Sequence, residues 1–402
     1  MQRLDLIKWI LHLSFFTIIF DGIIGILTFI SSSSTVANAL TGIWILKLFL
    51  SIILSLNSIG GISKSALYVL TVSLGLINLA RGFIEPRYES AILSSGFFYL
   101  IIIFGGASGF AWFQYIQDGG KIVFPKKHVG FWCVSLAVIC LLYFILFITG
   151  VISYFGMGVQ AYLISGLLLS SSQRVFLPAL VALATILTGK RGLFMVLIIQ
   201  NWQNILSLKR RYGMILAIAV FLLFILFTLV AFNLNLLDRF NVVFEVSIND
   251  LLNYEEPEAN HRLYLATSGR STEVIALLRV LDPYSWEFWF GYPSDFYLTM
   301  EDVSTNESWK QHYFHISPLN YLRHFGVLFG SWIFLIQVRV FIFAIRYGVA
   351  QKDIGLNLYV GYFCSMFFGA IVLIDILYWI TFFYSYLQFK NLYINSSKTK
   401  SW

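Results

Sequence analysis

Long apolar runs alternate with short polar connections along most of the chain. A helix that crosses a bilayer needs about 20 mostly apolar residues, because the hydrocarbon core is roughly 30 Å thick and each residue rises about 1.5 Å. Runs near this length predict about twelve spanning helices. The expected spans are 9–30, 39–56, 66–83, 91–113, 129–152, 158–171, 175–188, 192–206, 213–233, 317–345, 356–373 and 374–389.

The composition agrees with this pattern. Hydrophobic residues occupy 58% of the 402 positions and charged residues only 12%, whereas a soluble domain carries roughly 25% charged residues. So few polar side chains cannot cover a water-exposed surface, which excludes a cytosolic enzyme, a secreted domain and a disordered regulator. Cys133, Cys140 and Cys364 all lie in apolar runs, so we expect no disulfide framework and no metal site. We therefore predict an all-α, polytopic membrane protein.

The net charge of +7 is explained by membrane topology, because Lys and Arg gather in the cytoplasmic loops of membrane proteins. A cytoplasmic N-terminus places most basic residues inside, and twelve spans then make the C-terminus cytoplasmic as well. No solvated basic stripe suited to nucleic acid accompanies the charge. The first run contains Asp21 and is longer than the ~7–15-residue apolar core of a signal peptide, so we interpret it as an uncleaved span.

One connection is much longer than the others. Residues 234–314 form an external segment with thirteen acidic and five basic residues, so this face is net acidic. Loops of this length are usually functional, and helical periodicity over Arg270–Leu281 predicts a helix capped by Ser268 or Ser271. We divide the chain into a membrane bundle (1–233), a long periplasmic loop with short helices (234–314), and C-terminal spans with a cytoplasmic tail (315–402).

Lys190 and Arg191 are the first candidate site residues. They lie between the apolar runs Val175–Thr188 and Gly192–Leu206, which would rise only about 21–23 Å as helices, less than the hydrocarbon core. Two adjacent cations below the membrane surface are costly unless they meet an anion or reach water. A lipid-borne pyrophosphate would serve as that anion. The alternative is that both side chains extend to ordinary headgroups.

Arg270 is the second candidate, because it lies beside the expected helix start in the acidic segment. Free N–H groups at a helix N-terminus and an adjacent guanidinium together suit phosphate oxygens. The structural alternative is an ion pair with Glu273, three residues further on. We also assign Arg262 and Arg279 of this segment to substrate binding, although Arg279 is about half a turn out of phase with Arg270 on a regular helix.

His315 is the third candidate. Ser317 followed by Pro318 is a typical helix start, which places His315 just outside the tenth span at the membrane surface. A histidine there is able to accept a proton from an attacking sugar hydroxyl or to donate hydrogen bonds to phosphate. The alternative is a structural histidine. Gly326 and Gly330 further along have the spacing of closely packed helices.

Acids inside apolar runs suggest a rival class of protein. Asp21 and Asp375 are such acids, and Lys47 on the second span is the candidate basic partner of Asp21. Acidic residues within spans mark ion or proton pathways, so a proton-coupled transporter stays open. No nucleotide-binding loop, metal-ligand helix or nucleophile elbow is present in the sequence. We therefore expect no cofactor and no metal.

At these residues the chain resembles the bacterial O-antigen polymerase and O-antigen ligase superfamily of polytopic glycosyltransferases. Gly189–Gly192 resembles the family's (Ser/Lys)-Arg-Gly step, and Ser268-Gly269-Arg270 followed by Trp286 resembles its loop pattern. The stretch from His315 to Gly330 resembles the family's His-x-x-x-Leu and Gly-x-x-Gly entry into the next helix, although Pro318 and Asn320 depart from a simple helical run. The number and order of the spans and the position of the long loop also match the plan of this superfamily.

The resemblance implies a GT-C-like fold in the bacterial inner membrane, with the long loop in the periplasm. It implies transfer of an oligosaccharide from undecaprenyl pyrophosphate to a sugar hydroxyl without nucleotide or metal. Lys190, Arg191 and Arg270 would hold the pyrophosphate and stabilise the leaving group, and His315 would be the base or a further phosphate ligand. Trp286, Trp289 and Tyr292 would stack on sugars; alternatively they are interfacial anchors.

We favour the interpretation that the chain is a polymerase, since its high Ile, Phe and Ser content and its loose motifs are similar to those of the divergent polymerases. Its donor and acceptor would both be undecaprenyl-pyrophosphate-linked oligosaccharides in the membrane lipid, with a chain-length regulator as a possible partner. An O-antigen ligase, which transfers glycan to lipid A core, shares all these motifs. A polysaccharide flippase or another transporter is the remaining alternative.

Overall fold

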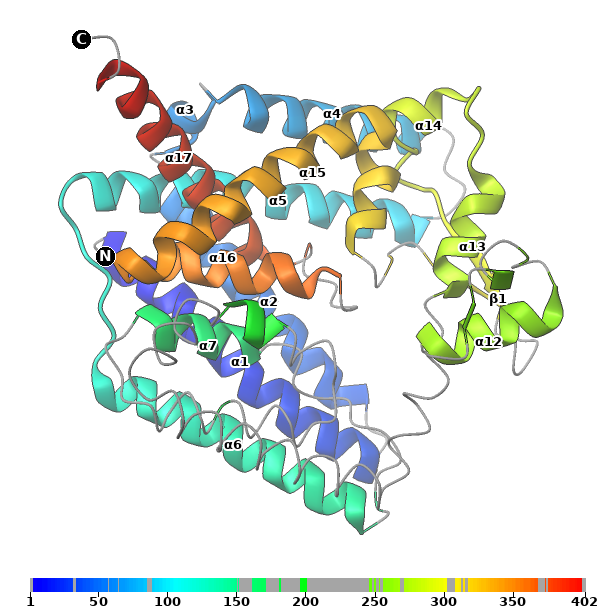
Figure 1. Cartoon of the computed structure of the whole chain (residues 1–402), viewed down its shortest axis with the longest axis horizontal. Helices are drawn as coiled ribbons and strands as arrows, with labels where there is room; N and C mark the ends of the chain where they lie inside the picture. Colours follow the sequence, from blue (N-terminus) through cyan, green and yellow to red (C-terminus); the bar gives the residue numbers. More distant parts are fainter. Residues whose placement is uncertain are drawn as a thin grey trace. The chain divides into compact units, whose positions relative to one another are not determined.

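The computed structural model shows a mostly helical chain (Figure 1). It describes residues 3–31, 34–56, 58–63, 65–84, 89–149, 151, 161–170, 181, 196–200, 246–247, 249–250, 253, 256–267, 271–301, 308–311, 314, 317–367, 373 and 375–399. The helices are α1 (Arg3–Ser31), α2 (Ser34–Ser55), α3 (Ile59–Ile62), α4 (Ala66–Ile84), α5 (Glu89–Gln117), α6 (Lys126–Ile148), α7 (Ala161–Ser170), α12 (Pro257–Thr267), α13 (Ser271–Val280), α14 (Trp286–Phe290), α15 (Ser317–Gln351), α16 (Ile354–Ser365) and α17 (Ile376–Thr399). The strands are β1 (Leu298–Glu301) and β2 (Ser308–Gln311).

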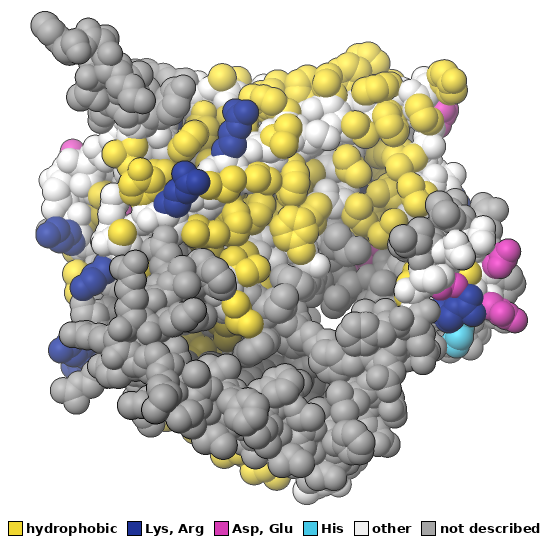
Figure 2. All heavy atoms as spheres, viewed as in Figure 1, with side chains coloured by type: hydrophobic (Ala, Val, Ile, Leu, Met, Phe, Trp, Pro, Cys, Tyr) yellow, Lys and Arg dark blue, Asp and Glu magenta, His cyan; other side chains and the backbone are white. Residues whose placement is uncertain are grey.

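Within the described residues, four helices are long and apolar enough to cross a membrane. They are Ala66–Ile84, Ala91–Gln117, Lys126–Leu146 and Ser317–Gln351. Large hydrophobic side chains are exposed along them, for example Leu335 on α15 at 59%. Figure 2 shows such side chains spread over the face that α15 presents. These helices confirm the prediction of a mostly helical membrane protein. The predicted spans 175–188 and 213–233 lie outside the described residues, apart from Val181.

Two compact units make up the chain. The first unit comprises Met1–Leu74, Phe97–Gln203 and Trp332–Trp402, and the second comprises Gly75–Gly96 and Asn204–Ser331. Three long helices, α4, α5 and α15, contribute one part to each unit.

The core of the first unit surrounds α16 and the beginning of α17. Every residue of α16 is buried. Residues 376–385 of α17 are buried as well. Close helix contact depends on glycine: a Cβ at Gly109 of α5 would lie only 2.6 Å from the carbonyl oxygen of Ile380. Helices that are apolar on all sides are expected at the centre of a membrane bundle.

The second unit contains the external segment. Its strands β1 and β2 pair antiparallel, with Leu298 opposite Gln311 and Glu301 opposite Ser308. Leu277 of α13, Leu298, Met300 and Phe314 form a buried hydrophobic cluster. This small hairpin is the exception to the all-α prediction, and the cluster explains its position, because one face of the hairpin packs against α13.

Helix α15 bends sharply at Gly326, where φ is +66° and ψ is −179°. A residue with a Cβ is strained at this φ, whereas glycine adopts it readily. The bend brings the chain back on itself, since a Cβ at Gly330 would lie 2.8 Å from the carbonyl oxygen of Tyr321, nine residues earlier. Figure 1 shows the resulting change of direction in α15. The closely spaced glycines, predicted to allow helix packing, therefore allow a kink within α15. Helical hydrogen bonds are commonly interrupted at such kinks.

Candidate functional site

Four of the predicted site residues, Lys190, Arg191, Arg270 and His315, lie outside the described residues. The structure does describe the chain immediately beside two of them. α13 begins at Ser271, directly after Arg270, as the sequence predicted. Phe314, directly before His315, is 1% exposed.

Asn320 holds the backbone next to His315. Its Nδ2 donates to the carbonyl oxygen of Phe314 at 2.9 Å, and its Oδ1 accepts from the Phe314 N–H at 3.0 Å. Asn320 is fully buried, so this two-point contact is shielded from water. Asn320, which departs from the simple helical run expected here, thus ties the start of α15 to Phe314, the residue before His315.

Arg262 of α12 is engaged in an ion pair. Its Nε donates to Asp250 Oδ1 at 2.9 Å, Nη2 donates to the same oxygen, and Glu258 lies 3.9 Å from Nη1. The hydrogen bonds from Arg262, followed by those from Ser247, lower the pKa of Asp250 to about 2. In this geometry Arg262 stabilises the beginning of the external segment.

Arg279 lies in the last turn of α13 and is exposed. A cation at a helix C-terminus interacts favourably with the helix dipole. Glu273 at the other end of α13 is 3% exposed and accepts from Gln311 Nε2 at 3.0 Å, which ties α13 to β2.

The predicted aromatic residues differ in accessibility. Trp286 and Trp289 of α14 are 61% and 44% exposed, whereas Tyr292 is 7% exposed. The Tyr292 ring stacks on Phe296 at 4.1 Å and its hydroxyl donates to the Val280 carbonyl oxygen at 3.2 Å. Burial, followed by the nearby Glu287 and Asp282 charges, raises the pKa of this phenol. Of these three residues the two tryptophans are exposed, and the Trp286 ring stacks on Phe290 with ring centroids 3.9 Å apart.

A polar cluster holds α14 against the end of α4 in the second unit. Arg81 Nη2 donates to Glu287 Oε1 at 2.7 Å, and Arg81 Nη1 donates to the Gly291 carbonyl oxygen at 3.0 Å. Asn78 Nδ2 donates to the carbonyl oxygens of Phe290 at 3.3 Å and of His324 at 2.7 Å. Asn78 and Arg81 are not among the predicted site residues; the one available signal in the sequence was a charge in the last turn of a span.

Arg323 is a buried cation in the same unit, at 1% exposure. Its Nη2 donates to the Phe296 carbonyl oxygen at 3.0 Å and lies 3.4 Å from Ser95 Oγ and from the Ser294 carbonyl oxygen. These contacts join α15, α5 and the loop after α14. A buried guanidinium requires such partners, because its desolvation is costly.

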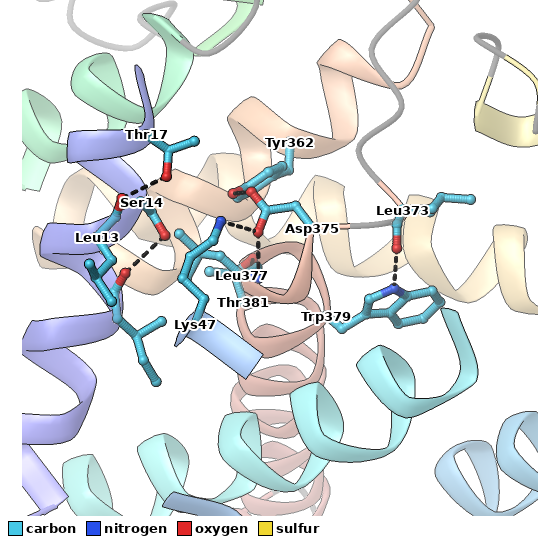
Figure 3. A network of polar contacts seen from close by, with 11 residues as sticks. Leu13, Ser14, Thr17, Lys47, Tyr362, Leu373, Asp375, Leu377, Trp379 and Thr381 are labelled. Carbon is cyan, nitrogen blue, oxygen red and sulfur yellow. Dashed lines mark hydrogen bonds and ion pairs between the residues drawn. The ribbon is translucent and has the colours of Figure 1, made fainter. Parts of the chain in front are cut away.

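Helices of the first unit enclose an ion pair that joins α2 to the start of α17. Lys47 Nζ lies 2.9 Å from Asp375 Oδ1, with side-chain exposures of 2% and 7%. Tyr362 donates to Asp375 Oδ2 at 2.7 Å, and the Leu377 N–H donates to Oδ1 at 3.1 Å. Figure 3 shows Lys47 and Tyr362 both pointing at the carboxylate. The structure thus gives Lys47 a partner other than the suggested Asp21.

No group of three or more His, Cys, Asp or Glu side chains suited to a metal ion occurs among the residues that the structure describes. No family model matches the chain, and neither the curated proteins nor the solved structures contain a match to it.

Proposed function

We propose that the protein is an O-antigen polymerase, which joins undecaprenyl-pyrophosphate-linked repeat units at the periplasmic face of the inner membrane. The observation that carries the proposal is the order of three motifs, Gly189–Gly192, Ser268–Arg270 and His315–Gly330, within a chain of membrane-spanning helices. In the third motif, Gly326 and Gly330 occupy positions where a Cβ would collide with backbone.

In the proposed reaction the bond between the sugar C1 and the pyrophosphate oxygen of the donor breaks. The hydroxyl oxygen of the acceptor sugar forms the new bond to C1, and its proton passes to His315. Lys190, Arg191 and Arg270 stabilise the negative charge that develops on the leaving pyrophosphate. No cofactor or metal is required for this transfer.

Two features of the described residues refine the roles in binding. Trp286 and Trp289 are exposed, whereas the buried Tyr292 acts by positioning the loop after α14. Arg262 stabilises the external segment through Asp250, and Arg279 is exposed in the last turn of α13.

The proposal includes the finer topology. It has twelve spans in a GT-C-like arrangement, both termini in the cytoplasm, and residues 234–314 in the periplasm between bundles at 1–233 and 315–402. The lipid-linked oligosaccharide is then both donor and acceptor, and a chain-length regulator would act on the same external face.

The surface glycan of a deletion strain tests the proposal. A single repeat unit on the lipid core is the expected result, because ligation continues while polymerisation stops. Full-length ladders retained on undecaprenyl pyrophosphate would instead assign the protein as an O-antigen ligase. Normal ladders on the lipid core would contradict both assignments.

The Lys47–Asp375 contact favours one alternative of another class, a flippase or proton-coupled transporter. Ionisable side chains within membrane-spanning segments often mark ion pathways. A transporter predicts that Asp375→Asn leaves repeat units on the cytoplasmic side of the membrane. The polymerase predicts that this variant, where it folds, still delivers lipid-linked units to the periplasmic side.

A further inference from the structure

The short helix α14 and the turn before it present an unusually apolar surface. Tyr284 is 98% exposed, Trp286 61% and Trp289 44%. Leu278 and Val280, at the end of α13, are exposed at 48% and 41%. Soluble proteins rarely expose several large apolar side chains together, and such a group marks an interaction surface.

This surface is rigidly mounted. The Gly326 kink brings α15 so close to α14 that a Cβ at Gly326 would overlap the carbonyl group of Trp289. Carbonyl groups of α15 near the kink are available to other partners: the Tyr292 N–H donates to the Arg323 carbonyl oxygen at 2.8 Å. Ser285 Oγ caps α14 by accepting from the Phe288 N–H at 3.2 Å. The exposed aromatic side chains therefore project from a fixed base.

α14 lies beside the end of one candidate span, α4, and beside the kink within another, α15. Glu287 of α14 pairs with Arg81 in the last turn of α4, a span of 19 residues, which is about 28 Å long. From the kink at Gly326, α15 runs on to Gln351, about 37 Å at 1.5 Å per residue. Each of these two helical segments is about as long as a bilayer is thick, and one end of each lies beside α14. Where these helices cross a bilayer, α14 would lie near the lipid headgroups.

Apolar exposure continues from these spans onto α14. Phe83 and Ile84, the last two residues of α4, are 63% and 76% exposed, and Leu328 after the kink is 50% exposed. Large apolar side chains are therefore exposed both on these helices and on α14. Trp and Tyr rings favour the interface, where an apolar body and a polar edge are both accommodated.

We infer that Tyr284, Trp286 and Trp289 bind membrane phospholipid, with α14 embedded in the headgroup layer at the end of α4. Trp289 Nε1 donates to the Pro283 carbonyl oxygen at 2.9 Å, so its polar edge is already satisfied and its ring is free to contact acyl chains. This binding holds the external segment on the bilayer, and it does not depend on the reaction that the protein catalyses.

The test uses the full chain in phosphatidylcholine–phosphatidylglycerol nanodiscs, with an environment-sensitive fluorophore on Tyr284→Cys. Glu258→Cys on α12, whose side chain is 91% exposed, is the matched control. The three natural cysteines are buried, and the unsubstituted chain gives the labelling background. Trp286→Cys is the second position, so one poorly folding variant does not decide the outcome.

The inference predicts that headgroup-linked spin-labelled lipid quenches the fluorophore at positions 284 and 286 at least twofold more than at 258. Aqueous iodide should show the opposite order. Equal iodide quenching at all three positions, without lipid quenching, would overturn the inference. Protection of positions 284 and 286 by a soluble oligosaccharide in place of lipid would also overturn it and support sugar stacking.

Discussion

The ammonium nitrogen of Lys47 lies 2.9 Å from a carboxylate oxygen of Asp375, although 328 positions separate the two residues. Both side chains are buried, and the carboxylate also accepts from Tyr362 and from the backbone of α17. An enclosed pair of this kind is costly to break from one side, because the remaining charge stays desolvated. It therefore joins α2 to α17 within the first unit.

Removing one charge of this pair should destabilise the protein strongly. We expect Asp375→Asn to lower the free energy of unfolding by about 3–5 kcal/mol, measured as a lower melting temperature in detergent. The double variant Lys47→Met/Asp375→Asn should recover most of this loss, because no charge then remains buried. If the double variant melts lower than Asp375→Asn alone, the ion pair does not have this structural role.

Gly326 is predicted to be essential for the packing of α14 on α15. Gly326→Ala should cost more than about 2 kcal/mol, because alanine is strained at positive φ and its Cβ would overlap the Trp289 carbonyl. Gly130→Ala on α6 is the matched control, since no heavy atom lies within 4 Å of its added Cβ. The control should be neutral or stabilising, because alanine favours a helix. Similar melting temperatures for both variants would contradict the kink's role.

Asn320 should affect activity through the residue before His315. Asn320→Asp loses the donor to the Phe314 carbonyl oxygen and places a carboxylate against it. We expect at least a tenfold lower rate of repeat-unit joining and about 1–3 kcal/mol of destabilisation. Asn391→Asp, in the C-terminal half of α17, controls for the added charge. Unchanged joining by a folded Asn320→Asp variant would refute a positioning role.

The Asp250–Arg262 ion pair should make the stability of the external segment depend on pH. Arg262 lowers the pKa of Asp250 from 3.8 to about 2, so the ionised carboxylate stabilises the folded segment. This contribution is fully present above pH 3.8 and is lost as the pH falls through about 2. Hydrogen exchange of α12, corrected for intrinsic rates, should therefore accelerate over that window. Arg262→Gln should remove most of the dependence; an identical pH profile in this variant would be inconsistent with the assignment.

Helices were predictable where apolar runs have clear ends. The sequence predicted spans at 66–83 and 91–113, and the structure has α4 at Ala66–Ile84 and α5 at Glu89–Gln117. It also predicted a helix over Arg270–Leu281, which the structure has at Ser271–Val280. The hairpin was missed, because four-residue strands give almost no periodic signal.

Contacts between distant residues could not be predicted in the same way. Asp375 was identified as an acid in an apolar run, with no partner assigned, and the structure pairs it with Lys47 of α2 at 5% exposure. The Arg81–Glu287 pair likewise joins residues 206 positions apart. Hydrophobic periodicity reports which face of a helix is apolar and carries no information on which helices meet. The bend at Gly326 was likewise missed, since a glycine within an apolar run also suits straight helices.

The most direct test of the proposed polymerase is the glycan ladder of strains that express Arg191→Ala, Arg270→Ala or His315→Ala. Lys121→Ala, an exposed cation in the connection before α6, is the control, and an epitope tag reports protein levels. We expect each of the three variants, at normal protein level, to yield one repeat unit on the lipid core, while the control yields full ladders. Intact ladders in all three variants would contradict it.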